Sequence, residues 1–157
     1  MQEEALKATM EKVVAWRRWL HQHPELSFQE KETSAFVERQ LRAFGWKVRT
    51  GVGGYGVVAD LEGELPGKRI ALRADMDALP IQDAKECEYA SKVPGVMHAC
   101  GHDGHTAALL GAAELLTKSA ERLKGSVRLL FQPAEEMTPG GAAAMIRDGA
   151  LVGVDEI

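Results

Sequence analysis

The segment from Gly104 to Lys118 constrains the fold most, because apolar residues occupy most sides of the helix that it predicts. These residues are too closely spaced to form one stripe: Ala107, Ala108, Leu109, Leu110, Ala112, Leu115 and Leu116. A helix of this kind is expected to be buried among other elements. An apolar run from Ser126 to Phe131 follows and predicts a strand. The chain is therefore expected to bury this helix in a layered structure.

Predicted helices and strands alternate along the rest of the chain. Further helices are expected over 3–22, from a capping box at Ser27–Glu30 to a C-cap at Gly45, and over 140–148. Further strands are expected over 46–50, 55–61 and 69–73, separated by turns at 51–54 and 65–67. Residues 74–96 are expected to be irregular, and 153–157 resemble the start of another strand. This order predicts an α/β layered domain.

Composition narrows the classes of function. A chain of 157 residues can form one domain, and its net charge of −4 disfavours nucleic acid as a partner. No apolar run approaches the length of a membrane span, so no membrane partner is expected. The acidic start resembles no secretory signal, and a cytoplasmic location is expected. Cys87 and Cys100 are therefore expected to stay unpaired.

The glycines of residues 51–56 match the pattern G-x-G-x-x-G of dinucleotide-binding proteins. Asp75 and Asp77 even follow at about the spacing of a ribose-binding acid, roughly 20 residues. That pattern must open a helix, however, and here it precedes the strand-like residues 57–61. A hairpin turn is the favoured interpretation, and a dinucleotide-binding oxidoreductase stays as an alternative that a helix after Gly56 would support.

Residues 97–105 gather a thiol, three imidazoles and a carboxylate: His98, Cys100, His102, Asp103 and His105. Cys and His are zinc-type ligands, and a Cys-x-His pair in a loop can converge on one ion. Cys100 and His102 are therefore the candidate ligands. Asp103 is expected to hydrogen-bond an imidazole. Structural roles are expected for His98 and His105.

A second acidic cluster, Glu135 and Glu136, follows the predicted strand and Pro133. One carboxylate would bind metal, and the other would take a proton from water and deliver it to a leaving amine. A solvated acidic pair is the alternative. Asp75 and Asp77 follow another strand end, where either ligand binding or turn capping would explain them.

These segments, in this order, resemble the M20 metallopeptidase family. More narrowly, they are similar to its amidohydrolase branch of N-acyl-amino-acid amidohydrolases, hippurate hydrolases, indoleacetyl-amino-acid hydrolases and N-acetyl-diaminopimelate deacetylases. The matching segments cover nearly the whole chain: 21–27, 50–53, 72–80, 89–91, 94–106, 131–136 and 145–149. The resemblance implies a three-layer αβα zinc-peptidase-like catalytic domain.

The resemblance also implies a site with two divalent metal ions, zinc first, with manganese, cobalt or nickel as alternatives. Cys100, His102 and Glu136 would be metal ligands, and Glu135 would be the general acid and base. Asp77 matches an aspartate that orients the site from behind the ligands. Asp75 stands where other branches carry a ligand histidine, and it has no assigned role.

The implied activity is hydrolysis of the amide bond of an N-acyl amino acid, a small-molecule substrate. Family members are considerably longer, so residues 1–157 are expected to be the N-terminal part of a truncated catalytic domain. Two further histidine ligands, the C-terminal part and an inserted domain that covers the site and forms a homo-oligomer would be absent. A catalytically inactive fragment with a structural or binding role is therefore the alternative expectation.

Overall fold

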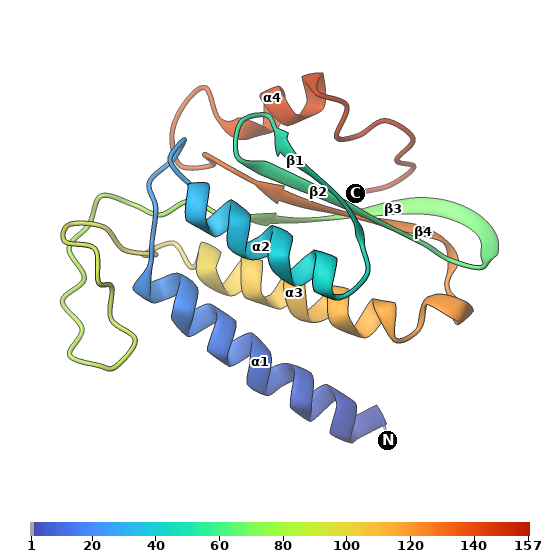
Figure 1. Cartoon of the computed structure of the whole chain (residues 1–157). Coiled ribbons are helices and arrows are strands. Elements are labelled where there is room, and N and C mark those ends of the chain that lie inside the picture. The colour runs from blue at the N-terminus through green and yellow to red at the C-terminus, as the bar shows by residue number, and fades with distance from the viewer. Residues whose placement is uncertain (1) are drawn as a thin grey trace.

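A four-stranded sheet in the order β1-β2-β4-β3 forms the middle of the structure (Figure 1), a computed structural model that describes residues 2–157. Its strands are β1 (Lys47–Val52), β2 (Gly56–Glu62), β3 (Leu65–Asp75) and β4 (Lys124–Gln132). β2 pairs antiparallel with both β1 and β4, whereas β3 pairs parallel with β4. Parallel strands require a crossover connection, so the chain leaves the sheet after β3 and returns to β4 through a helix.

Helices cover both faces of this sheet (Figure 1). They are α1 (Gln2–Gln22), α2 (Lys31–Ala43), the crossover helix α3 (His102–Thr117) and α4 (Gly141–Arg147), with a short 3₁₀ turn at Ala120–Arg122. α2 and α3 lie on one face with α1 packed against α3, and α4 lies on the other face. The α/β class expected from the sequence is confirmed. Among residues 2–157, no helix is long and apolar enough to cross a membrane.

Alternate residues of the central strands supply two separate apolar cores. Leu129 and Phe131 of β4 point to one face, where they join fully buried Leu110 of α3. Leu130 points to the opposite face and packs with Met145 of α4. The strongly apolar helix predicted over 104–118 is confirmed, and it is buried because it lies between the sheet and α1.

α3 begins two residues earlier than the sequence predicted, at His102. Gly101 precedes it with a left-handed φ of +93°, which glycine adopts without a steric penalty. His102 and Asp103 therefore lie in the first turn of the helix, and both are buried.

Two predicted local motifs are wrong. The capping box at Ser27–Glu30 does not form, because Glu30 makes no side-chain cap hydrogen bond. Instead, the carboxylate of Glu25 accepts the backbone N–H groups of Glu32 and Thr33 at 3.0 and 2.8 Å. The predicted turn at 65–67 is also wrong: the chain turns at 63–64, and residues 65–67 belong to β3.

The two ends of predicted segments agree better with the structure. Gly45 follows α2 with φ +89°, and the N–H of Trp46 donates to the carbonyl of Leu41, which closes the helix end. Residues 153–157 run beside β3, where Glu156 forms a single parallel bridge with Ile70. Residues 76–101 contain no helix or extended strand, as expected for an irregular segment.

The glycine-rich segment is a hairpin turn. β2 begins at Gly56, directly after the turn, and pairs antiparallel with β1. Because no helix follows these glycines, the dinucleotide-binding interpretation is wrong. Gly53 also needs its lack of a side chain, since a Cβ there would lie 2.5 Å from the backbone nitrogen of Met145.

Replacing Gly53 with alanine is expected to destabilise the protein by roughly 2–4 kcal/mol, because the new methyl group meets α4 at a positive φ of +66°. Gly51→Ala is the matched control: its φ is +72°, but its nearest non-neighbour atom would be 3.9 Å away. The control should cost only about 1–2 kcal/mol from backbone conformation. Urea unfolding measures both, and equal losses would contradict the close approach of α4.

Candidate metal centre

The candidate residues gather at one edge of the sheet, beyond the ends of two parallel strands. Asp75 is the last residue of β3, and Asp77 follows it. β4 ends at Gln132, and Glu136 follows soon after. Because β3 and β4 are parallel, their carboxyl ends meet at the same edge, which is where α/β sheets bind ligands. α3 starts at this edge and brings His102 to the carboxylates.

Cys100, His102 and Glu136 come together as the sequence predicted. One potential ligand atom from each lies within 4.8 Å of the other two. Nε2 of His102 is 3.7 Å from Oε1 of Glu136, and this buried oxygen has no hydrogen-bond partner among residues 2–157. A thiol, an imidazole and a carboxylate are the donor set of a zinc-type site, and the unpartnered oxygen leaves an electron pair for a cation.

The orientation of His102 suits a ligand. Its Nδ1 lies 2.9 Å from the carbonyl oxygen of Asp77. A carbonyl oxygen can only accept a hydrogen bond, so Nδ1 carries the proton. Nε2 then keeps its free electron pair and faces the acidic side chains, which is the tautomer that metal binding through Nε2 requires.

Asp77 holds three parts of this region together. Its Oδ2 accepts the hydroxyl of Ser27 at 2.7 Å and the backbone N–H of Glu136 at 2.9 Å, and its Oδ1 lies 3.2 Å from Nδ1 of His102. Burial alone would raise the pKa of Asp77, but these hydrogen bonds outweigh burial and hold that pKa well below its usual range. Asp77 therefore acts as a charged acceptor behind His102 and Glu136.

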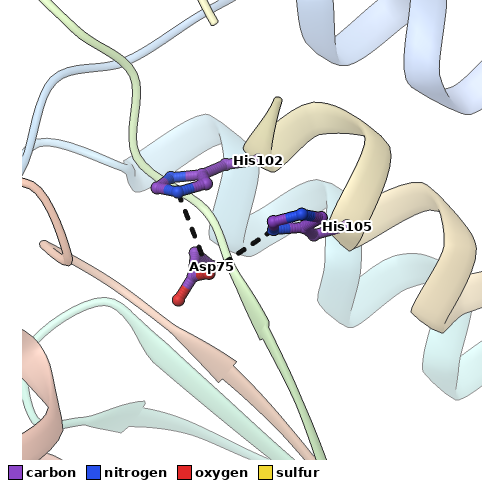
Figure 2. A group of neighbouring side chains, drawn as sticks. All are labelled: Asp75, His102 and His105. Atoms are coloured by element: carbon purple, nitrogen blue, oxygen red, sulfur yellow. Dashed lines mark ion pairs between the residues drawn. The ribbon is translucent and has the colours of Figure 1, made fainter. Parts of the chain in front are cut away.

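Asp75 and His105 extend the cluster (Figure 2). Oδ2 of Asp75 lies 3.8 Å from Nε2 of His102 and 3.5 Å from Nδ1 of His105, and the three side chains form a second group that could hold an ion. The sequence analysis assigned no role to Asp75 and only a structural role to His105. The spacing of three residues between His102 and His105 places both on one side of α3, and this signal could have identified the second group.

Negative charge dominates around His102. Besides Glu136 and Asp75, the carboxylate of Glu135 lies 3.8 Å from its Nε2. Burial would lower the pKa of His102, but the hydrogen bond to Asp77 and the charge of Asp75 raise it overall. The pKa of the Cys100 thiol is raised by its hydrogen bond to Glu136, by burial and by the acidic neighbours. Such an excess of anionic groups is stabilised by a bound cation.

Asp103 does contact an imidazole, as predicted, but that imidazole is His21 at the end of α1. Its Oδ2 lies 2.6 Å from Nδ1 of His21 and 2.9 Å from Nε of Arg17. This buried cluster joins α1 to the first turn of α3, directly beside His102. His98 belongs to neither potential ligand group, and burial lowers its pKa to about 4.

Residues 71–157, more than half of the chain, match the model of peptidase family M20/M25/M40. The chain therefore belongs to this family of metallohydrolases, as its motifs predicted.

Proteins of known name show the same relationship. The chain is 50% identical over 161 residues to an N-acyl-L-amino acid amidohydrolase of Geobacillus stearothermophilus, covering 100% of this chain and 44% of the relative. It is 54% identical over 151 residues to an N-acetyl-L-cysteine deacetylase of Bacillus subtilis, covering 96% of this chain and 36% of the relative. The chain thus spans only about two fifths of the length of these relatives.

A solved structure resembles the whole described fold. The YXEP protein of Bacillus subtilis, described as a dinuclear metal binding peptidase from the M20 family, superposes with a TM-score of 0.89 and 47% sequence identity. The match covers 94% of this chain and 42% of that protein. The fold class predicted from the sequence is therefore that of a family member.

Cys87 and Cys100 are both free and exposed, and their reactivity tests the metal site. Without metal, Cys100 is expected to alkylate slowly at neutral pH, because its raised pKa keeps the thiol protonated, and faster as the pH rises. Added zinc should protect Cys100 from iodoacetamide while Cys87 still reacts, as peptide mass spectrometry would show. Equal protection of both thiols, or a Cys87–Cys100 disulfide in the unreduced protein, would contradict a ligand role for Cys100.

Proposed function

We propose that this chain carries the metal-binding half of an active site that hydrolyses the amide bond of N-acyl amino acids. The observation that carries the proposal is the convergence of Cys100, His102 and Glu136, with Glu135 beside them. The names of the relatives support the reaction: one is an N-acyl-L-amino acid amidohydrolase and another a deacetylase. A further relative from Saccharolobus solfataricus, 49% identical, is named a thermostable carboxypeptidase.

The donor set fits a divalent ion. Cys100, His102 and Glu136 would hold it, and a thiolate and an imidazole favour zinc, with manganese, cobalt and nickel as alternatives. Two ions are proposed because a structural relative is described as dinuclear. A bound divalent ion supplies a Lewis acid that polarises the scissile carbonyl and makes a neighbouring water more acidic.

Glu135 and Glu136 are proposed to divide the chemistry. The side chain of Glu135 is 41% exposed and that of Glu136 only 21%, so Glu135 is the more open to substrate. Glu135 would take a proton from the attacking water as its oxygen bonds to the carbonyl carbon. When the carbon–nitrogen bond breaks, Glu135 would return that proton to the leaving amine. Asp77 would keep His102 and Glu136 in place during both steps.

A catalytically inactive binding role is the second candidate. It is supported by the small number of donors in the group at Cys100 and by the share of its relatives that the chain spans, about two fifths. The cytoplasmic location and the homo-oligomeric state of a complete protein stay predictions from the sequence.

The two glutamates are expected to respond differently to substitution in a complete enzyme that carries these residues. Glu135→Gln keeps the shape but removes the base, so kcat should fall by about 10²–10⁴-fold while bound metal is retained. Glu136→Gln should instead lower the metal content measured by atomic emission. Near-normal turnover by Glu135→Gln would require another residue to transfer the proton.

The 157-residue chain itself is expected to bind metal weakly and to hydrolyse N-acetyl and N-benzoyl amino acids negligibly. Its group at Cys100 offers three donors, too few to hold two ions about 3.5–4 Å apart. Amine release, measured with added zinc, manganese or cobalt, tests this. Robust turnover that follows metal occupancy would favour a working enzyme over the inactive role, and it would show that these residues suffice.

A further inference from the structure

Glu30 is a fully buried carboxyl group outside the candidate ligand groups. It lies just before α2, 0% of it is exposed, and no cation pairs with it among residues 2–157. Burial raises its pKa, which makes the position costly for a glutamate. The sequence explained Glu30 as part of a capping box, but Glu25 fills that role in the structure. Another contact must therefore account for Glu30.

That contact is with the acidic loop, defined here as residues 133–136. Oε1 of Glu30 accepts the backbone N–H of Ala134 at 2.7 Å, across 104 positions of sequence. Ala134 is buried and has a φ of +49°, a left-handed conformation that is unusual for a residue other than glycine. The hydrogen bond from Ala134 to Glu30 helps to hold this conformation, and Glu135 and Glu136 follow directly.

A second buried contact comes from the same short segment. Ser27 donates its hydroxyl to Oδ2 of Asp77, and that oxygen also accepts the N–H of Glu136. The backbone N–H groups on either side of Glu135 are therefore each fixed by a buried carboxyl group, Ala134 by Glu30 and Glu136 by Asp77. This arrangement determines where both acidic side chains of the loop begin.

We propose that Glu30 is a positioning residue that sets the backbone of the acidic loop, so that Glu136 faces His102 while Glu135 stays open to substrate. The proposal rests on the proposed function for the purpose of this arrangement. It needs only an acceptor at Oε1, because the partner is a neutral N–H group. Glutamine offers the same acceptor at the same length, whereas aspartate is one methylene shorter and alanine has no acceptor.

Cobalt(II) titration of the 157-residue chain tests the effect on the site, with the sulfur-to-cobalt absorption of Cys100 as the signal. Glu30→Ala and Glu30→Asp are expected to weaken cobalt affinity by about 10–100-fold, the range seen when a group that orients a ligand is removed. Glu30→Gln should stay within about threefold of the unsubstituted chain. Glu25→Ala is the control, since it removes the real cap of α2 and should lower Tm with little change in affinity.

Amide exchange followed by NMR supplies a second signal that needs no metal. In Glu30→Asp, the N–H groups of both Ala134 and Glu136 should exchange faster than in Glu30→Gln, because the loop loosens as a unit. Acceleration at Ala134 alone, or equal cobalt affinity in folded Asp and Gln variants, would overturn the proposal. If Glu30→Ala does not fold, the Asp and Gln variants decide the question.

The failure of the proposed function would look different. If the unsubstituted chain shows no sulfur-to-cobalt absorption, the metal centre at Cys100 is wrong. The exchange of the Glu136 amide would still decide whether Glu30 positions the loop.

Discussion

The parallel pairing of β3 with β4 is the constraint on which the candidate site depends. Because these strands run the same way, both end at one edge, and the acidic residues that follow them meet there. The same pairing forces a crossover, and the crossover helix α3 begins at that edge with His102 in its first turn. One feature of topology thus brings together the ligand candidates from three segments of the chain.

Buried carboxylates then fix the geometry that the topology makes available. Asp77 ties His102 to the loop of Glu136, Asp103 ties the start of α3 to α1, and Glu30 holds Ala134. Each of these carboxylates is buried, which is unfavourable unless hydrogen bonds compensate. Their positions around one edge of the sheet suggest that the fold sacrifices some stability to orient these side chains.

Much of the fold could be predicted because it depends on local patterns. Apolar periodicity identified α3 and β4, and the strand after Gly56 was enough to favour a hairpin over a dinucleotide site. The convergence of Cys100, His102 and Glu136 was also predicted, from the ligand chemistry of two motifs. The partners of Ser27, Glu30 and Asp103 could not be predicted, because they lie 50, 104 and 82 positions away in the sequence. A local motif such as the capping box was instead the nearest explanation, and tertiary contacts overrode it.

The strand order has a consequence for synthesis of the chain. β2 and β3 are consecutive in sequence, yet β4 lies between them, so β4 must enter a gap whose two sides already exist. Until residues 124–132 leave the ribosome, the facing edges of β2 and β3 have no partner and are open to wrong pairing. The nascent chain therefore completes its sheet only shortly before Glu135 and Glu136 emerge, and it cannot load metal at this centre any earlier.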